Sequence, residues 1–264
     1  MISKIKISVV LSAYNGENHI QEAIQSILNQ TLQNFELIII DDGSTDETLH
    51  QIETFKDDRI ILKSIYHVGL TKALNQGLCL ARGDYIARMD ADDIALPNRF
   101  EKQVSYLDQH SRVVCVGTAY EVLLANGNRI KPRVPILTSS YKIKKALPKF
   151  NPFMHGSMMI RREGLERIGF YNEKFRLSQD YDLWFRMAQE YEMANLNEVL
   201  MIRREGKQTF LKEKRQNWFA IQARLKAIQE GNSSSWNLIY MIRPFFVMVT
   251  PNWLKRIIRQ IGFR

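Results

Sequence analysis

The first half of the chain alternates short apolar runs with stretches in which apolar residues recur at helical spacing. Ile5–Leu11 and Phe35–Ile40 have the length of strands, and the second is typical of a strand buried on both faces. Between them lies one apolar helical face, made of Ile20, Ala23, Ile24, Ile27 and Leu28. This region therefore predicts a strand, a helix and a second strand.

The same alternation continues to about residue 118. Further strands are expected at Ile60–Ser64, Asp84–Met89 and Val113–Thr118. Helices are expected from Asp46, a capping residue, to Phe55, and over Leu70–Ala81 and Pro97–His110. Strand–helix alternation of this kind predicts an α/β fold with a mixed, mostly parallel sheet flanked by helices.

The pattern changes beyond residue 118. Prolines and turn residues from about 126 to 150 indicate an excursion over the surface, and ordered periodicity returns over 156–200 with helices at Gly164–Ile168 and Asp180–Glu190. A basic helix is expected over 211–230, and a Gly-Asn-Ser-Ser-Ser linker follows at 231–235. We therefore expect a domain of residues 1–210, with halves at 1–118 and 119–210, and a basic helical tail at 211–264.

Composition is that of a globular protein, but the charge is unevenly distributed. The 264 residues are 45% hydrophobic and 25% charged, with a net charge of +9. Residues 201–264 hold 13 basic residues against three acidic ones, so the basic excess lies entirely in the last quarter. Attraction to anionic partners is therefore expected of the tail rather than of the main domain.

The two cysteines and the amino terminus favour a cytoplasmic protein. Cys79 and Cys115 lack the spacing of metal ligands, and so few cysteines suit a reduced compartment. The first apolar run is too short for the core of a signal peptide and fits a strand better.

Carboxylates follow two of the expected strands. One strand ends at Asp41-Asp42, and another runs directly into Asp90-Ala91-Asp92-Asp93. The carboxyl ends of parallel strands are where open α/β sheets bind ligands, and crowded carboxylates need a cation to stay ionised together. Oxygen ligands of this kind suit Mg²⁺ or Mn²⁺ shared with substrate phosphates. The alternative is a polar turn that leads into the next helix.

The sequence lacks the signatures of other nucleotide-binding and catalytic classes. Neither a P-loop nor a G-x-G-x-x-G loop follows the first strand, which disfavours P-loop NTPases and dinucleotide-binding Rossmann domains. No Ser/His/Asp or Cys/His arrangement for covalent catalysis is visible.

Four ordered motifs resemble those of family 2 glycosyltransferases. The opening strand and loop of that family are matched by Ser8–Glu17, and its acidic turn by Asp41–Asp46. Its metal-binding block is matched within Gly69–Asp93, and its acceptor-side motifs by His155–Arg162 and Gln179–Arg186. The resemblance covers roughly residues 5–210. It is specific for the superfamily and not for the sugar that is moved.

The resemblance implies a GT-A fold, a nucleotide-sugar donor and a divalent cation, Mn²⁺ or Mg²⁺. Asp90 and Asp92 would bind the metal, Asp92 more directly, and Asp180 would be the catalytic base. His155 and Trp184 would lie on the acceptor side. The residues implied to bind the nucleotide sugar all belong to these motifs: Ser12, Ala13, Tyr14, Glu17, Asp42, Asn75, Arg82, Asp90 and Ala91.

General chemistry agrees with these roles. A carboxylate-bound cation stabilises the negative charge that builds on a departing diphosphate. A second carboxylate accepts the proton of the attacking hydroxyl. One base and one metal suffice for a single displacement with inversion at the anomeric carbon.

Each assignment has a structural alternative. Asp180 could cap a helix, and Tyr14 could belong to the core. Arg82 could be a solvated helix end, and His155 a turn residue. Trp184 is better explained by packing beneath the site than by stacking on substrate.

Two residues depart from the family pattern. Gln179 stands where an acidic residue usually precedes the base, and losing that like charge should leave the pKa of Asp180 lower. Glu205 stands where relatives commonly carry a histidine, so we assign no metal or diphosphate role to this position.

The end of the chain combines apolar and basic residues. Trp236–Thr250 is apolar, but Arg243-Pro244 interrupts it and it is too short to span a bilayer. Beyond it, one helical face is expected from Trp253, Leu254, Ile257, Ile258 and Ile261. A basic amphipathic helix suits an anionic membrane surface, and packing on the main domain is the alternative. Nucleic acid is disfavoured as a partner because nothing resembles a readout module.

We therefore predict an inverting, metal-dependent glycosyltransferase that moves a sugar from a nucleotide donor, expected to be UDP-linked, to a growing glycan or lipid-linked saccharide. We expect it in the cytoplasm, peripheral on the inner face of a bacterial cytoplasmic membrane. One alternative is a nucleotidyltransferase, but Asn15-Gly16-Glu17 does not supply its glycine-rich basic loop. The other is a non-catalytic nucleotide-sugar-binding or scaffold protein on the same fold.

Overall fold

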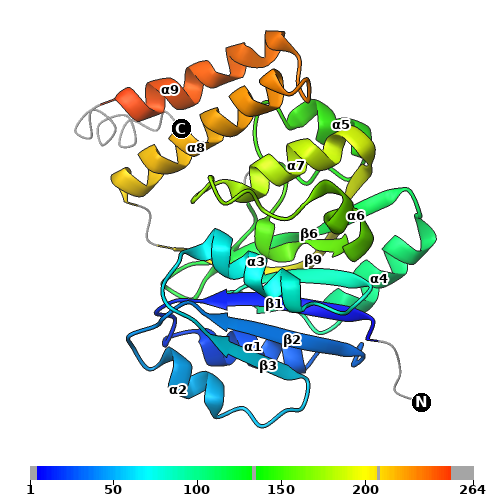
Figure 1. The fold of residues 1–264 in the computed structure, drawn as a ribbon, viewed down its shortest axis with the longest axis vertical. Coiled ribbons are helices and arrows are strands. Elements are labelled where there is room, and N and C mark those ends of the chain that lie inside the picture. Colours follow the sequence, from blue (N-terminus) through cyan, green and yellow to red (C-terminus); the bar gives the residue numbers. More distant parts are fainter. Residues whose placement is uncertain (1–4, 133–134, 207–208, 251–264) are drawn as a thin grey trace.

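A computed structural model of the chain describes residues 5–132, 135–206 and 209–250. Helices flank a central sheet, and the carboxyl-terminal helices α8 and α9 lie at the end farthest from strands β2 and β3 (Figure 1). The strands are β1 Ile7–Ala13, β2 Phe35–Asp41, β3 Ile60–Ser64, β4 Tyr85–Asp90, β5 Ile94–Ala95, β6 Val113–Leu123, β7 Arg129–Ile130, β8 Met159–Arg161 and β9 Glu192–Arg204. The helices are α1 Ile20–Leu28, α2 Thr48–Glu53, α3 Leu70–Leu80, α4 Arg99–Gln109, α5 Ser140–Ala146, α6 Arg162–Ile168, α7 Gln179–Glu190, α8 Phe210–Gln229 and α9 Ile242–Val249, with 3₁₀ turns η1 His155–Ser157 and η2 Ser235–Met241.

The first half of the sheet is parallel, as the alternation of strands and helices predicts. Strands β3, β2, β1 and β4 lie in that order and all pair in parallel. Ala13 is paired with Asp41, and Ser12 with Asp90, so the three strands end together. This register brings the two predicted acidic segments to one edge of the sheet.

The second half of the sheet is mixed. β8 pairs antiparallel with β4 and β6, and β9 pairs in parallel with β6 and antiparallel with β5. The expected α/β class is confirmed, but β9 was not predicted as a strand. Its pairing with β6 is interrupted by register shifts between Thr118 and Tyr120, and polar residues break its apolar pattern. The boundary expected at residue 118 falls inside β6.

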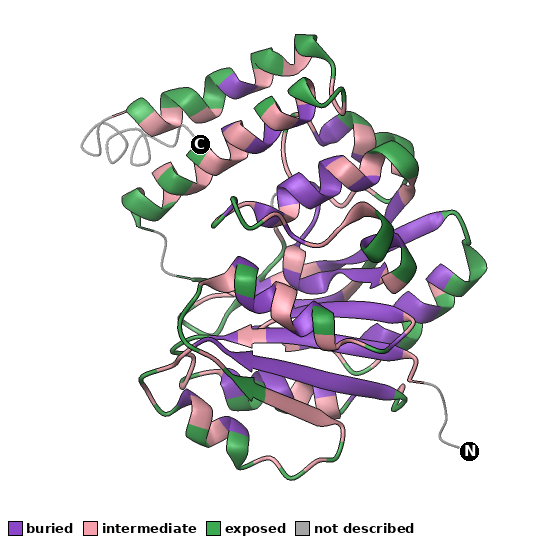
Figure 2. Ribbon diagram, in the orientation of Figure 1, coloured by how far each residue is buried: buried purple, intermediate pink, exposed green. Residues whose placement is uncertain are grey.

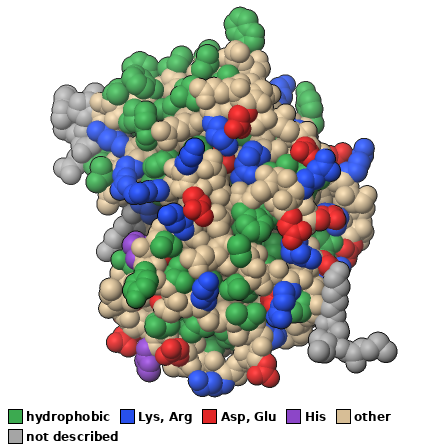
Figure 3. All heavy atoms as spheres, in the orientation of Figure 1, with side chains coloured by type: hydrophobic (Ala, Val, Ile, Leu, Met, Phe, Trp, Pro, Cys, Tyr) green, Lys and Arg blue, Asp and Glu red, His purple; other side chains and the backbone are tan. Residues whose placement is uncertain are grey.

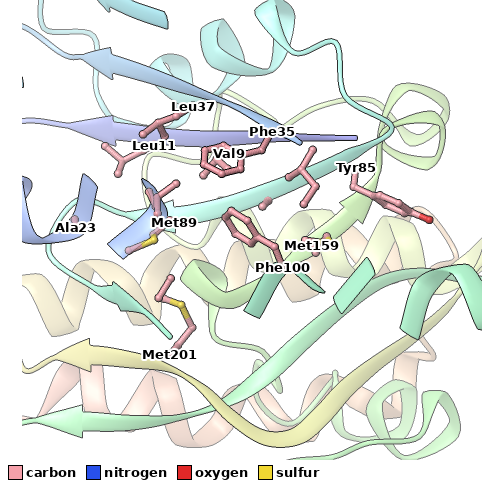
Figure 4. Packing of buried hydrophobic residues seen from close by; sticks show 14 of the residues in the cluster. Val9, Leu11, Ala23, Phe35, Leu37, Tyr85, Met89, Phe100, Met159 and Met201 are labelled. Atoms are coloured by element: carbon pink, nitrogen blue, oxygen red, sulfur yellow. The ribbon is translucent and has the colours of Figure 1, made fainter. Parts of the chain in front are cut away.

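Apolar side chains from both halves of the sheet form the core. Every residue of β2 is buried, as expected for a strand covered on both faces (Figure 2). Phe100 of α4 meets Phe35 edge to face, with ring centroids 5.7 Å apart. Figure 4 shows Met89 of β4 and Met201 of β9 in the same cluster, which joins the two halves. Fully burying one such side chain contributes about 1.5–3 kcal/mol, so this cluster fixes the sheet that carries the strand ends.

Two parts of the region 126–150 form regular elements that its turn residues do not predict. Arg129–Ile130 pairs with β6, and Ser140–Ala146 forms α5. The buried side chains of this helix, Ile143 and Ala146, hold it against the domain.

The carboxyl-terminal segment forms two layers of helix. α8 packs on α7, and α9 packs on α8 (Figure 1). The hydroxyl of Thr209 accepts a hydrogen bond from the Lys212 N–H (3.2 Å) and caps α8, as expected of threonine at a helix start. The predicted amphipathic helix at 253–261 lies outside the described residues. Across 5–132, 135–206 and 209–250, none of the helices has both the length and the apolar character that a bilayer crossing requires.

Candidate active site

A cavity of about 380 Å³ opens where β1, β2 and β4 end. Its lining comes from the loop after β1, from Asp42 and His67, and from the end of β4. The predicted residues that line it are Ser12, Tyr14, Asp42, Asp90, Ala91 and Asp92. Parallel pairing explains their meeting, because the strands end side by side at the edge where α/β sheets bind ligands.

Two aromatic rings form one wall of this first cavity. The exposed ring of Tyr14 stacks on the imidazole of His67, with centroids 4.0 Å apart and planes 27° from parallel. Asp42 holds the loop that carries His67, because its buried carboxylate accepts hydrogen bonds from the N–H groups of Val68 (2.7 Å) and Gly69 (2.9 Å). Sequence reasoning missed His67, since nothing in the loop pattern singled it out.

A second, larger cavity of about 730 Å³ adjoins the first. Leu70, Asp90 and Asp92 line both cavities. The larger one reaches His155 of η1, Asp180 of α7 and the first turns of α8 at Lys212 and Gln216, and it includes both departures from the family pattern, Gln179 and Glu205. The two cavities therefore meet at the predicted metal-binding pair.

Arg88 and three carboxylates form the floor of the junction. A guanidinium nitrogen of Arg88, which is almost completely buried in β4, forms an ion pair with the Asp90 carboxylate. Burial, and then the charge of Asp90, raises the pKa of Asp92. Burial and the charges of Asp90 and Asp92 raise the pKa of Asp93 to about 8. The sequence signal that singles out Arg88 is a charged residue inside an otherwise apolar strand.

Asp180 lies in the wall of the larger cavity, at the first turn of α7. Ser178, two residues before Asp180, precedes α7 and has a left-handed backbone (φ 57°). One Asp180 oxygen accepts a hydrogen bond from the side-chain amide of Asn151 (2.7 Å). Burial raises the pKa of Asp180, while the Asn151 hydrogen bond opposes that shift. Gln179 puts no like charge beside Asp180, and the pKa of Asp180 is nevertheless raised, because the carboxyl is buried.

His155 and Trp184 differ in their access to the cavity. His155 lines the larger cavity, and its Nε2 lies 2.6 Å from the Tyr171 hydroxyl. Burial, and then the charge of Arg88, lowers the pKa of His155 well below its usual value, so the ring is neutral at pH 7. Trp184 is fully buried and packs on Phe153 with ring centroids 5.3 Å apart, in agreement with its interpretation as packing beneath the site.

Two residues implied to bind the donor, Glu17 and Asn75, have hydrogen-bond partners away from the cavities. Glu17 accepts a hydrogen bond from the Glu47 N–H (3.1 Å) at the start of α2. Asn75 binds the backbone of Tyr171 through both atoms of its amide. Neither residue lines either of the two cavities.

Arg82 lies near the amino ends of the strands, opposite the carboxyl ends at which the cavities open. Its guanidinium donates to the buried carboxylate of Glu36 at 2.9 and 2.6 Å, near the amino ends of β1 and β2. The two ends of the strands are separated by the length of the strands, so Arg82 does not reach the cavities. Ala13 is buried at the end of β1, where its carbonyl accepts a hydrogen bond from the Asp42 N–H (2.8 Å), and it lines neither cavity.

The side chains at the junction fit a divalent cation that is shared with a ligand. Asp90 and Asp92 offer hard oxygen ligands where the two cavities meet, and one buried Asp93 oxygen has no hydrogen-bond partner among the described residues. Within those residues, no group of three or more His, Cys, Asp or Glu side chains is arranged to hold a metal by itself. Mg²⁺ commonly takes one or two carboxylates and completes its shell with water and phosphate oxygens.

Comparison with known proteins shows the family of the chain. Residues 8–169 match the model of glycosyl transferase family 2. The chain belongs to this family. It is therefore a glycosyltransferase, which confirms the enzyme class predicted from the motifs.

Relatives and solved structures extend the match to nearly the whole chain. The amylovoran biosynthesis glycosyltransferase AmsE of Erwinia amylovora is 34% identical over 248 residues, which are 89% of this chain and 91% of AmsE. TarS of S. aureus in complex with UDP-GlcNAc superposes with a TM-score of 0.72 at 16% identity, over 91% of this chain and 72% of the other. A mannosyltransferase of Pyrobaculum calidifontis in complex with GDP-Man and Mn²⁺ has a TM-score of 0.68 at 18% identity, over 99% and 80%. The fold is GT-A, as the resemblance implied.

Proposed function

We propose that this glycosyltransferase is inverting and metal-dependent, and that it moves a sugar from a UDP-linked donor to a hydroxyl of a growing glycan or lipid-linked saccharide. The observation that carries the proposal is the meeting of two cavities at Asp90 and Asp92, with Asp180 in the wall of the larger one. A donor in the smaller cavity would have its diphosphate at the junction, and an acceptor would approach from the larger cavity.

The donor side supplies an aromatic platform and a fixed loop. The stacked rings of Tyr14 and His67 offer a face for a nucleotide base. The backbone of the His67 loop is held by Asp42, so the platform is formed before a ligand arrives. Ser12, Asp90 and Ala91 line the same cavity, where they would contact the ribose and diphosphate.

Asp90 and Asp92 would hold the cation, Mn²⁺ or Mg²⁺. When bound, such a cation supplies positive charge to the departing diphosphate. Arg88 keeps the Asp90 carboxylate in place through its ion pair. The raised pKa of Asp92 reflects burial and repulsion from Asp90, and a nearby positive charge relieves that repulsion.

Asp180 would take the proton of the acceptor hydroxyl. Its raised pKa makes it a stronger base than an exposed carboxylate, and the hydrogen bond from Asn151 orients one of its oxygens. Asp180 belongs to α7, whereas Asp90 ends β4 and Asp92 lies in the turn that follows, and all three line the same cavity. This placement fits attack on the anomeric carbon from the side opposite the leaving group. The polysaccharide synthesis named for AmsE supports a saccharide acceptor.

Two variants test the proposal together. Asp92→Asn should abolish turnover and weaken Mn²⁺-dependent donor binding, measured by calorimetry with UDP. Asp180→Asn should leave donor binding unchanged and lower kcat by about 10²–10⁴-fold, the usual effect of losing a general base. Glu173→Gln, an exposed carboxylate that lines neither cavity, is the matched control. Unchanged kinetics in Asp92→Asn would remove the metal assignment.

The donor is identified by ligand-induced stabilisation. A panel of nucleotide sugars with Mn²⁺ should raise the melting temperature most for the true donor, since a ligand that binds only the native state stabilises it by mass action. Donors that stabilise the wild type but are never hydrolysed or transferred would instead support a nucleotide-sugar-binding protein.

A further inference from the structure

The carboxyl-terminal end of the molecule exposes an unusual amount of apolar surface. Of the 15 large hydrophobic side chains that are exposed in the described residues, seven fall between residues 236 and 249. They are Trp236, Leu238, Ile239, Ile242, Phe245, Phe246 and Val249. Figure 3 shows hydrophobic side chains gathered at this end of the molecule, with Lys and Arg side chains beside them. We refer to these seven residues as the apolar cap.

The spacing within α9 shows that the cap is an ordered face. Ile242, Phe245, Phe246 and Val249 recur at the intervals of one helical face, and each is between 51% and 62% exposed. No residue of α9 is buried, although the helix packs on α8 and η2. An apolar face of this kind normally points into a core, and contiguous exposed patches on soluble proteins mark interaction sites.

The charges around the cap select its partner. Within the described residues 231–250, Arg243 is the one basic residue and there is no aspartate or glutamate, and residues 140–150 contain four lysines and no acid. These two segments meet in space, because the ammonium of Lys149 lies 5.3 Å from the centroid of the Tyr240 ring. Lys149 and Arg243 therefore put positive charge beside the apolar cap, and this charge complements an anionic surface.

The composition of the cap suits a membrane interface more than a protein interface. Trp236 is 89% exposed, and Tyr141 of α5 is exposed with Lys145 over its ring. Tryptophan and tyrosine prefer the headgroup region of a bilayer, where the ring is half apolar and half solvated. A helix with an apolar face and basic borders lies in the plane of that interface.

We propose that the apolar cap of η2 and α9, with its basic border, docks this protein on an anionic lipid surface. α8 carries α9 and also lines the larger cavity through Lys212 and Gln216. Docking would therefore hold the proposed acceptor cavity near the bilayer. That last step rests on the proposed function, whereas docking itself does not.

The test is co-sedimentation of the full-length chain with vesicles, without donor or acceptor, so that its result is independent of turnover. Wild type should bind vesicles of equal parts phosphatidylcholine and phosphatidylglycerol, and binding should fall as NaCl is raised. Phe245→Ser combined with Phe246→Ser should lower the partition coefficient by about tenfold or more, because two apolar side chains leave the interface. Arg243→Gln with Lys149→Gln should weaken binding to the anionic vesicles only.

Controls separate docking from misfolding. Tyr66→Ser removes an exposed aromatic side chain from the loop after β3 and should bind vesicles like wild type. Unchanged melting temperatures should accompany all variants, because the changed side chains are exposed. Equal vesicle binding by wild type and the Phe245/Phe246 variant overturns the proposal. So does a wild-type dimer, seen by sedimentation velocity, that the variant abolishes without any vesicle binding, because the cap would then pair two copies.

Discussion

Helices α1 and α9 carry the same apolar pattern and have opposite surroundings. Ile20, Ala23, Ile24 and Ile27 of α1 recur at intervals of three, one and three residues and are 0% exposed. The four apolar residues of α9 recur at the same intervals, and all are more than half exposed. α1 lies against the sheet, whereas α9 lies on another helix at the edge of the molecule (Figure 1). Periodicity shows which residues share a face, and the neighbouring elements decide whether anything covers it.

The largest expected effect is on stability, in the buried helix α1. Ile24→Ala should lower the free energy of unfolding by about 2–5 kcal/mol, because it leaves a cavity in a packed core. Phe246→Ala should change it by no more than about 0.5 kcal/mol, as is usual for an exposed position. Urea unfolding followed by circular dichroism measures both. A loss at Phe246 as large as that at Ile24 would show that α9 packs against something within the chain.

A smaller effect on stability is expected near the amino ends of the strands, away from the cavities. Arg82→Ala should lower stability by about 1–2 kcal/mol, because the buried Glu36 carboxylate loses its two guanidinium hydrogen bonds. The KM for donor should not change, since Arg82 lies across the sheet from the cavities. A raised KM with unchanged stability would support the nucleotide-sugar-binding role that the resemblance implied for Arg82.

The smallest expected effect is a shift in pH dependence. Asn151→Asp keeps an acceptor for the Phe153 N–H but removes the donor to Asp180 and adds a like charge beside it. Both changes favour protonated Asp180 and raise its pKa further. A base acts when deprotonated, so the acid limb of the kcat/KM profile should move to higher pH. A limb that stays in place or moves to lower pH would exclude Asp180 as the group that titrates there.

The sequence was a better guide to the parallel half than to the mixed half. Strands β1 to β4 are each specified by a local apolar run, and the acidic segments follow directly after β2 and β4. β9 is specified by its pairing with β6 and β5 instead. Its polar residues interrupt the apolar pattern from which a strand would be predicted locally. Asp180 could be found only through a motif, because α7 reaches the cavity through the tertiary fold.

The charge of a residue gave a similarly incomplete guide to its role. Arg82 and Arg88 both stand near the acidic block, yet one faces Glu36 at the far edge of the sheet and the other holds Asp90 at the junction of the cavities. His67 became part of the site only because Asp42 binds its loop. The residue type alone predicts neither the positions of the two arginines nor the place of His67 in the cavity wall.

The sequence by itself determined the alternation of strands and helices, the acids at strand ends, the family and the uneven charge. These properties are local, since they depend on the order of residues and on the short-range geometry of strand and helix. Only the tertiary structure decided which acids share a cavity, which motif residues serve the packing and which apolar face stays uncovered. Those properties depend on contacts between segments far apart in the chain, where burial and neighbouring charge outweigh local preference.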